Sequence, residues 1–384
     1  AFLGPQEYLE KQAERVRDHP LITSHFNAEV VETRGYMGNF TSTIAYAGGP
    51  GRMEVSHGAT VVCVGGVEYR GDEYLYGTDP RITTQQQFEG LLAKHEKDPG
   101  SADPLPVRIV MIQCVGPADR YCGRICCTSA LKNALNLKRL NPAASITVLY
   151  KDIRTYGFKE RLYTQAREAG VLFMRYEDEW APQVSIDAAG VLEVSAWEVI
   201  LGRQMKLNPD LLVLSTPIVP SPGAKDLARR LKVPQDDNGF FLEAHVKLRP
   251  VDFLSDGIFM AGLAHYPKLL HESIIQARAA AARAATILSR ETLSAGGLVA
   301  EVDQQKCVAC LTCVRVCAFG ASRLEADASG VGEIAGAARI EPSMCQGCGV
   351  CVSECPAGAI ELKHYTAGQM RAKLGALLEE ATLQ

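Results

Sequence analysis

Short apolar runs alternate with longer amphipathic segments through the middle of this chain. Residues 107–113, 145–150 and 211–215 are apolar runs of the length typical of buried parallel strands. Residues 128–140 and 158–169 lie between them and have the composition of helices. Strands that alternate with helices in this way predict a parallel α/β domain.

The N-terminal part of the chain has a different pattern. Residues 5–19 are rich in helix formers and end at a proline, which predicts a helix. Strands are expected over residues 35–45 and 52–55, joined by a glycine-rich turn. Residues 59–64 form a short apolar run, which predicts a buried parallel strand with Cys63 as a core residue.

The composition is that of an ordinary folded protein. Hydrophobic residues make up 47% of the 384 residues, charged residues make up 22%, and the net charge is −4. These values exclude a disordered chain and do not suggest a basic nucleic-acid surface. No apolar run reaches about 18 residues, so we expect no membrane span. Charged residues also occupy the place of a signal peptide's apolar segment, which indicates a protein of the reducing cytoplasm.

The most informative feature is a set of 13 cysteines. Eight of them form two copies of the spacing CxxCxxCxxxC near the C-terminus. This is the spacing of bacterial two-cluster ferredoxins, in which the fourth cysteine of each motif binds the other motif's [4Fe–4S] cluster. Structural zinc sites favour two CxxC pairs instead. The expected ligand sets are Cys307, Cys310, Cys313 and Cys355 for one cluster, and Cys345, Cys348, Cys351 and Cys317 for the other.

Small residues within the motifs, Ala309, Gly347 and Gly349, are expected to let backbone N–H groups approach the cluster sulfurs. Pro356 follows the second motif, whereas Ala318 follows the first, which leaves the geometry of the first turn open.

Four further cysteines lie in the loop between the strand at 107–113 and the helix at 128–140. A dinucleotide-binding protein would carry GxGxxG in this loop, and this chain lacks that motif. Thiols near a helix N-terminus, with Arg120 and Arg124 beside them, would suit an anionic cluster. On spacing alone, a redox-active dithiol or buried cysteines without a ligand stay open as alternatives. The four residues are Cys114, Cys122, Cys126 and Cys127.

The charged stretch at residues 151–161 is expected to be a solvated loop and helix face. The alternative is a docking surface for another protein of a complex. No arrangement typical of a hydrolase is present in the sequence.

The chain resembles a known family in residues 57–77, 121–142 and 261–288, together with the two ferredoxin motifs. These segments are similar to the A subunits of heterodisulfide reductase, which are iron–sulfur flavoproteins. The resemblance implies an α/β fold with a thioredoxin-reductase-like (pyridine nucleotide-disulfide oxidoreductase) core, followed by a ferredoxin domain with two [4Fe–4S] clusters. It further implies a third [4Fe–4S] cluster on the four cysteines between 114 and 127.

The same resemblance implies a division of the chain around a flavin. Residues 1–100 would be the remainder of an FAD-binding domain, 101–240 an insert that carries the cysteines, 241–297 the end of the FAD domain, and 298–384 the ferredoxin domain. The family's N-terminal GxGxxG is absent, so we expect the chain to begin partway through the flavin domain. FAD is implied for the full-length protein. The implied flavin contacts are Gly65, Gly66, Gly262, His265, Pro267 and Lys268.

By this resemblance, the chain is an electron-transferring oxidoreductase subunit of an anaerobic complex, with flavin-based electron bifurcation coupled to disulfide or ferredoxin reduction. The implied partners are subunits like heterodisulfide reductase B and C, a hydrogenase- or formate-dehydrogenase-type electron donor, and ferredoxin. Two alternatives remain at this point. One is an electron-wiring subunit without flavin, and the other is a scaffold in which zinc or clusters serve only folding.

Overall fold

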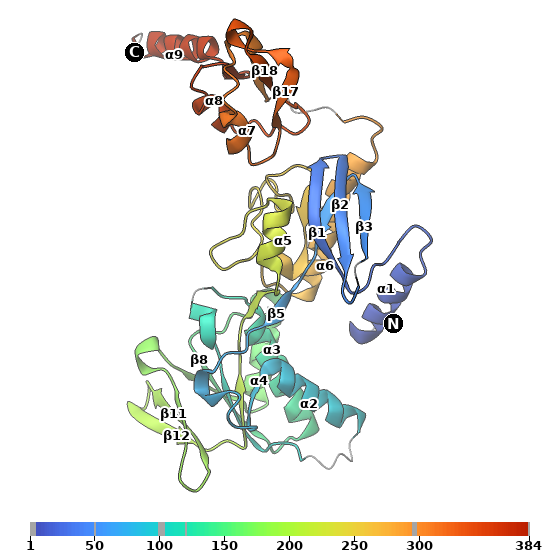
Figure 1. Ribbon diagram of the computed structural model, residues 1–384. Helices are drawn as coiled ribbons and strands as arrows, with labels where there is room; N and C mark the ends of the chain where they lie inside the picture. Colours follow the sequence, from blue (N-terminus) through green and yellow to red (C-terminus); the bar gives the residue numbers. More distant parts are fainter. Residues whose placement is uncertain (1–4, 50, 99–103, 120, 294–297, 383–384) are drawn as a thin grey trace.

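The computed structural model describes residues 5–49, 51–98, 104–119, 121–293 and 298–382. Three parts follow one another along the molecule: a unit around a five-stranded sheet, a middle unit that contains β1–β3, and a cysteine-rich C-terminal unit (Figure 1). Arg120 and part of the expected linker at 98–106 lie outside the described residues. No helix in the described ranges has the length and apolar character needed to cross a membrane.

The five-stranded sheet is parallel, with the strand order β6-β13-β7-β8-β9. Its apolar strands are buried on both faces, which is the pattern expected from the sequence. The α/β expectation is therefore confirmed. The strands are β6 Ile82–Thr84, β7 Arg108–Ile112, β8 Ser145–Tyr150, β9 Leu172–Arg175 and β13 Leu211–Leu214.

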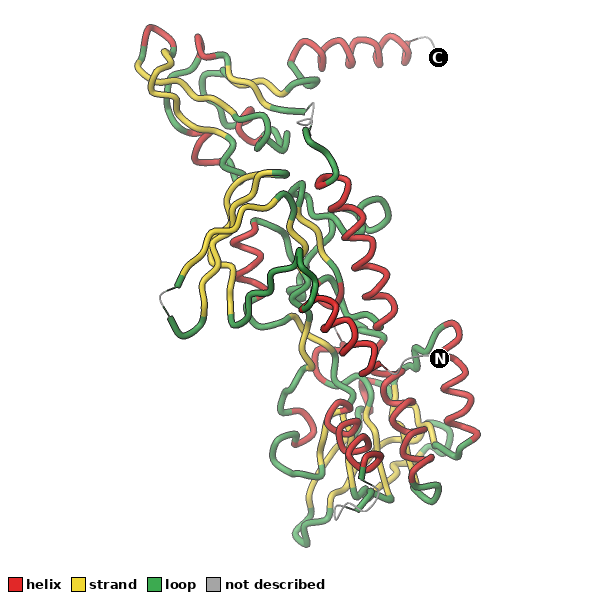
Figure 2. Tube along the Cα trace, turned by 90° about the vertical axis from the view of Figure 1, so that its right-hand side faces the viewer, coloured by secondary structure: helices red, strands yellow, loops and turns green. Residues whose placement is uncertain are grey.

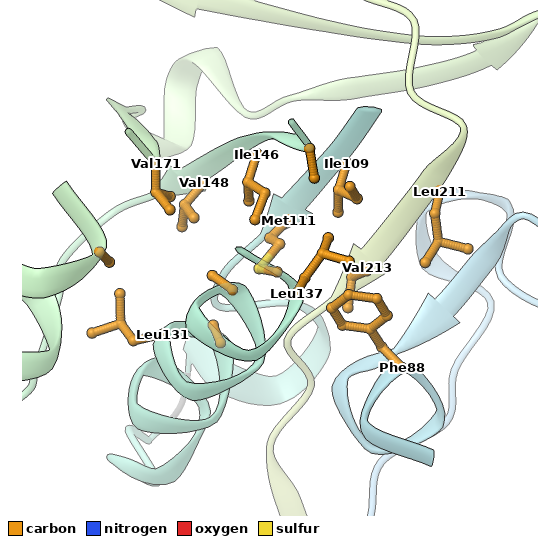
Figure 3. Packing of buried hydrophobic residues seen from close by; sticks show 14 of the residues in the cluster. Phe88, Ile109, Met111, Leu131, Leu137, Ile146, Val148, Val171, Leu211 and Val213 are labelled. Carbon is orange, nitrogen blue, oxygen red and sulfur yellow. The ribbon is translucent and has the colours of Figure 1, made fainter. Parts of the chain in front are cut away.

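Helices cover one face of this sheet. They are α2 Gln85–Lys97, α3 Ile125–Leu140 and α4 Glu160–Glu168. Leu131 and Leu137 of α3 pack against Met111 and Ile146 of the sheet, and Phe88 of α2 joins them (Figure 3). Each of these side chains is fully buried, and burying a side chain of this size contributes about 1.5–3 kcal/mol.

A three-stranded antiparallel sheet covers the opposite face. Its strands are β10 Gln183–Ile186, β11 Leu192–Glu198 and β12 Arg203–Leu207. Leu192 and Val194 of β11 are buried in one cluster with Val110, Ile112 and Leu149 of the parallel sheet. This added layer gives the sheet its second buried face.

The middle unit is built from segments on both sides of the parallel sheet. An antiparallel sheet β1-β2-β3 packs with α5, while short strands pair as β4 with β15 (parallel) and β5 with β14 (antiparallel). The elements are α1 Pro5–Arg17, β1 Ala28–Tyr36, β2 Asn39–Tyr46, β3 Arg52–His57, β4 Thr60–Val62, β5 Gly66–Glu68, β14 Ile218–Pro220, α5 Ala224–Leu231, β15 Ile258–Met260 and α6 Leu270–Leu288.

The pairing of β5 with β14 shows that the inserted unit lies between these two strands, that is, between residues 68 and 218. We expected this insert to span residues 101–240. β6 and α2 belong to the parallel sheet unit, and α5 packs on β1 in the middle unit. The reason is that β5 pairs with β14, so the chain leaves and re-enters the middle unit at these strands.

Cys63 is not a core residue, contrary to the expectation. It directly follows β4 and is exposed, whereas Val62 beside it is buried at 3% exposure. Successive side chains along an extended segment point to opposite faces. Only the face that bears Val62 is covered, by residues that include Met260 and Phe241.

The C-terminal unit consists of two strand pairs, with short helices between the strands and a longer helix after them. β16 pairs with β19 and β17 pairs with β18, both antiparallel. The last helix, α9, extends away from the rest of the unit (Figure 2). The elements are β16 Ala300–Val302, α7 Thr312–Val316, β17 Ser322–Ser329, β18 Ala335–Ile340, α8 Val350–Ser353, β19 Ile360–Leu362 and α9 Ala367–Thr382.

Candidate iron–sulfur sites

The C-terminal unit contains an internal repeat with an offset of 38 residues. Residues with positive φ mark both cysteine loops: Ala309 and Leu311 in the first loop, and Gly347 and Gly349 in the second. The two loops therefore have the same backbone conformation, although the first uses alanine and leucine where the second uses glycine. The repeat extends the match between the motifs from sequence spacing to backbone conformation.

Two cavities lie between the cysteine loops and the strands, and each is lined by four cysteines. Both sets are crossed as the ferredoxin spacing predicts, so each cavity receives three cysteines from one motif and the last cysteine of the other. The first cavity has Cys307, Cys310, Cys313 and Cys355, and the second has Cys317, Cys345, Cys348 and Cys351.

Backbone amides donate hydrogen bonds to four of these sulfurs, which shows how the residues present fit a cluster. A [4Fe–4S] cluster with its thiolates is anionic, and N–H donors directed at sulfur stabilise it. Around the donors the cavity walls are largely apolar. The bonds run from Ala338 to Cys307 (3.4 Å), Ala300 to Cys345 (3.4 Å), Ala321 to Cys317 (3.3 Å) and Ala359 to Cys355 (3.3 Å).

The eight thiols surround two spaces and do not converge on single points. Within the described ranges, no three His, Cys, Asp or Glu side chains lie close enough to hold one metal ion. A tetrahedral zinc site requires four such ligands at about 2.3 Å from the metal. The residues present fit a cubane cluster in each cavity.

The first motif makes the same turn as the second even though it lacks proline. Gly320 N–H donates to the Cys317 carbonyl at 3.2 Å, and Gly358 N–H donates to the Cys355 carbonyl at 3.1 Å. Ala318 thus occupies the place of Pro356 without a change in the hydrogen bonding of the turn.

The four cysteines of the α/β unit gather at the carboxyl end of β7. Cys114 follows β7 with φ +60°, and Cys126 and Cys127 lie in the first turn of α3. Burial, together with repulsion from Cys127 and Cys122, raises the pKa of Cys114 to about 11. A hydrogen bond from Cys126 lowers the pKa of Cys127 to about 7 and raises that of Cys126. Four thiolates can coexist here only when a cationic group binds them.

Two cations from the charged stretch at 151–161, which we expected to be solvated, lie beside these cysteines. Lys151 and Arg154 both favour the thiolate of Cys114, and Arg154 also interacts with Cys122. They follow β8, which neighbours β7 in the parallel sheet, so both loops meet at one edge. The composition of the stretch at 151–161 is that of a solvated loop and gives no hint of this role. The expected adjacency of the strands at 107–113 and 145–150 is the signal that could have identified Lys151 and Arg154.

Arg124, which we expected to offset thiolate charge, has other partners. Its guanidinium lies 5.4 Å from the centre of the Tyr156 ring and 3.5 Å from the Glu272 carboxylate. It thereby links the cysteine loop to α6.

Unpartnered polar atoms adjoin this cysteine group in the chain. Gln113 is fully buried, and neither its amide nitrogen nor its amide oxygen has a partner. The hydroxyl of Thr128 is also buried and unpartnered. Gln113 immediately precedes Cys114, and Thr128 immediately follows Cys127. Buried polar atoms without partners are costly, and these two residues directly flank cysteines of the group in the chain.

A cavity of about 670 Å³ has Cys126 in its wall. This volume is within the range of small-molecule sites. Two of the expected flavin contacts, Gly66 and Pro267, are in its wall. The remaining lining residues are Val67, Glu68, Arg70, Gln85, Gln86, Glu89, Gly123, Ile125, Cys126, Ser129, Thr216, Pro217, Ile218 and Leu263.

The other expected flavin contacts do not line this cavity. Lys268 donates from Nζ to the carbonyls of Gly262 and Tyr266, both at 2.8 Å, and burial lowers its pKa to about 8. Gly65 lies in the left-handed region beside the cavity. A Cβ on Gly66 would meet Ile218 at 2.7 Å, so this glycine is already required by the β5–β14 contact.

His265 is likewise bonded within its own unit. Its Nε2 bonds Glu243 at 2.9 Å and its Nδ1 bonds Gln276 at 2.7 Å. Burial and the charge of Lys268 lower the pKa of His265. Of the expected flavin contacts, Gly66 and Pro267 therefore line the cavity. The side chains of His265 and Lys268 instead form hydrogen bonds within the protein.

Comparisons with known proteins found matches both to the C-terminal unit and to most of the chain. Residues 306–359 match the family model of the 4Fe-4S dicluster domain. The A subunit of the ferredoxin:CoB-CoM heterodisulfide reductase of Methanosarcina acetivorans is 34% identical over 369 residues, covering 85% of this chain and 44% of that protein. The A subunit of the H(2):CoB-CoM heterodisulfide,ferredoxin reductase of Methanothermobacter marburgensis is 34% identical over 346 residues, covering 86% of this chain and 51% of that protein.

The chain thus spans about half the length of these curated relatives or less. Among solved structures, the thioredoxin reductase of T. acidophilum is similar with a TM-score of 0.47 and 12% identity, over 74% of this chain and 80% of that one.

Proposed function

We propose that this chain, which belongs with the A subunits of heterodisulfide reductase, transfers electrons through [4Fe–4S] clusters as part of an oxidoreductase complex. The observation that carries the proposal is the arrangement of the C-terminal cysteines. Two crossed sets of four surround two cavities, with backbone amides directed at four of the sulfurs. The dicluster family match covers the same residues.

The clusters supply one-electron chemistry when they are bound. The protein's part is to hold them and to stabilise the charge that each electron adds. In the C-terminal unit, Ala321 and Ala359 direct amides at the sulfurs of the two crossing cysteines. Because each cavity takes a cysteine from the opposite motif, a displacement of one loop affects both sites. This arrangement fits two carriers that exchange electrons with each other.

We propose a third cluster on the cysteines between 114 and 127. Lys151 and Arg154 there offset the charge of thiolates that burial and mutual repulsion would otherwise disfavour. Cys126 belongs to this group and also lines the 670 Å³ cavity, so a redox-active ligand in the cavity would lie next to the cluster. This proximity supports electron exchange between such a ligand and the proposed third cluster.

The proposal extends to the flavin, to the coupling of two electron-transfer reactions and to the partner proteins. It comprises FAD in the full-length protein, electron bifurcation, and a complex with subunits like heterodisulfide reductase B and C, a hydrogenase- or formate-dehydrogenase-type donor, and ferredoxin. The relatives' names support the heterodisulfide reductase complex and, for the Methanothermobacter protein, reduction of both a heterodisulfide and ferredoxin.

An electron-wiring subunit without flavin is the second candidate. It is favoured by one observation, namely that Lys268 and His265 are bonded inside the protein and do not line the cavity. Flavin content of the anaerobically purified chain distinguishes the two. About one flavin per chain supports the flavoprotein, whereas none, with clusters intact, supports the wiring subunit.

The test of the proposed function is iron and acid-labile sulfide per chain after anaerobic purification. Three [4Fe–4S] clusters predict about 12 iron atoms, and the C-terminal pair alone predicts about 8. Cys126→Ser should lower the value from about 12 to about 8, while the exposed Cys63→Ser is the matched control and should leave it unchanged. Redox-inert zinc in place of iron would overturn the proposal.

A further inference from the structure

One buried hydroxyl in the C-terminal unit has no partner. Ser322, the first residue of β17, is 5% exposed, and its Oγ makes no hydrogen bond. The same residue lines the second cavity, together with Cys317, Cys345, Cys348 and Cys351. A buried hydroxyl that lacks a partner costs roughly 1–3 kcal/mol, so its place in a cavity wall calls for a hydrogen-bond acceptor in that cavity.

The internal repeat shows that this hydroxyl is present at one site only. The residue 38 positions after Ser322 is Ile360, which lines the first cavity in the corresponding place. Their strand neighbours also correspond, because Ser322 pairs with Ile340 and Ile360 pairs with Val302. The two cavities therefore share their cysteine arrangement and their amide donors, but differ in this polar group.

We propose that the Ser322 hydroxyl donates a hydrogen bond to a sulfur of the cluster held in the second cavity and raises the reduction potential of that cluster. This inference rests on the proposed function, since it requires a cluster on Cys317, Cys345, Cys348 and Cys351. Reduction adds one negative charge to the cluster, and a hydrogen bond to sulfur stabilises the reduced form more than the oxidised form. The electron would then rest preferentially at the second site.

The first site also has a hydroxyl near a cysteine sulfur, but it belongs to a different residue, Thr312. Thr312 Oγ1 and Cys310 Sγ are 3.4 Å apart, and Val350 stands at the equivalent position of the second motif. Cys310 is exposed, so water competes for its sulfur, whereas the buried Ser322 has no such competitor. The buried bond is the stronger influence because the surrounding dielectric is lower.

The experiment is an anaerobic redox titration of the full chain, followed by the electron paramagnetic resonance of the reduced clusters. Ser322→Ala should lower the ratio of reduced to oxidised second cluster about tenfold at a fixed potential, which is about 59 mV for one electron. The first cluster should not change. Ser322→Thr keeps the hydroxyl and should restore the wild-type ratio. The β-branched Ile360 at the equivalent position shows that this place in the repeat accepts such a side chain.

Ile360→Ser is the reciprocal variant, and it also assigns the signals to the two sites. It should raise the potential of the first cluster and leave the second where it is. The inference is overturned if both sites contain their full iron and Ser322→Ala leaves the potential of the second cluster unchanged. If the wild-type second site contains no iron, the proposed function itself fails, so the two failures are distinguishable by iron content.

Discussion

The backbone N–H of Ala321 donates a hydrogen bond to the Sγ of Cys317 over a distance of 3.3 Å. Cys317 ends the first cysteine motif, yet it lines the cavity that is otherwise built from the second motif. The amide therefore stabilises a thiolate at the point where the two halves of the repeat interlock. The equivalent bond from Ala359 to Cys355 has the same length.

Crossed ligation predicts an unusual effect of single substitutions. Cys355→Ser should weaken or remove the cluster of the first cavity, although Cys355 belongs to the second motif. Cys317→Ser should do the same to the second cavity. Iron content near half of the wild-type C-terminal value, with loss of the opposite motif's resonance, would confirm the crossing. Loss of the cluster of the same motif in each variant would contradict it.

Arg154 is expected to raise the reduction potential of the proposed third cluster, because its cation lies beside Cys122. Arg154→Gln should lower this potential by about 40 mV, which corresponds to about 1 kcal/mol for one electron. Arg161→Gln is the matched control, since it removes the same charge from an exposed position whose contact is with Phe158. A redox titration compares the two variants. Equal shifts would show that general surface charge is responsible and not the position of Arg154.

Ala309 adopts φ +53°, a conformation that favours glycine, and Gly347 occupies the equivalent position of the repeat. Ala309→Gly should stabilise the C-terminal unit by about 1 kcal/mol, because the left-handed backbone is strained for alanine. Ala335→Gly, at an exposed strand position whose φ is negative, should instead cost about 0.5–1 kcal/mol. Denaturant unfolding of the full chain measures both changes, and a loss of stability in Ala309→Gly would contradict the strain argument.

The ion pair between Asp79 and Arg81 predicts a pH dependence of stability. Hydrogen bonds from Arg81, at 2.6 Å and 3.0 Å, hold the pKa of Asp79 below its usual value. A carboxyl group whose folded pKa is lowered stabilises the fold above its unfolded pKa of about 3.9, and this stabilisation is lost as the pH falls through the folded pKa.

Asp79→Asn should therefore cost up to about 1 kcal/mol at pH 7 and less at pH 2–3. Unfolding curves across this pH range measure the difference between wild type and variant. A difference that is independent of pH would mean that the carboxylate charge does not contribute.

The alternation of apolar runs and helical segments was sufficient to predict the parallel α/β unit, since a strand buried on both faces is apolar along its length. The cysteine spacing was sufficient to predict which thiols of the C-terminal unit come together, because three closely spaced ligands and a fourth after a turn constrain the loop. The ferredoxin spacing also predicts that Cys355 joins the cysteines of the first motif, and the structure places Cys355 and Cys307 in the wall of one cavity.

The surroundings of the sites were decided by contacts between distant segments. Arg154 lies near Cys122 because β7 and β8 are neighbours in the sheet, and Cys63 is exposed because only one face beside β4 is covered. Lys268 bonds to the carbonyls of its own loop, which no residue pattern indicates. Ser322 and Ile360 differ by one hydroxyl, and only the folded repeat shows that each lines a cysteine cavity. The charge, burial and hydrogen bonding of a side chain depend on which elements meet, and that is a property of the tertiary structure.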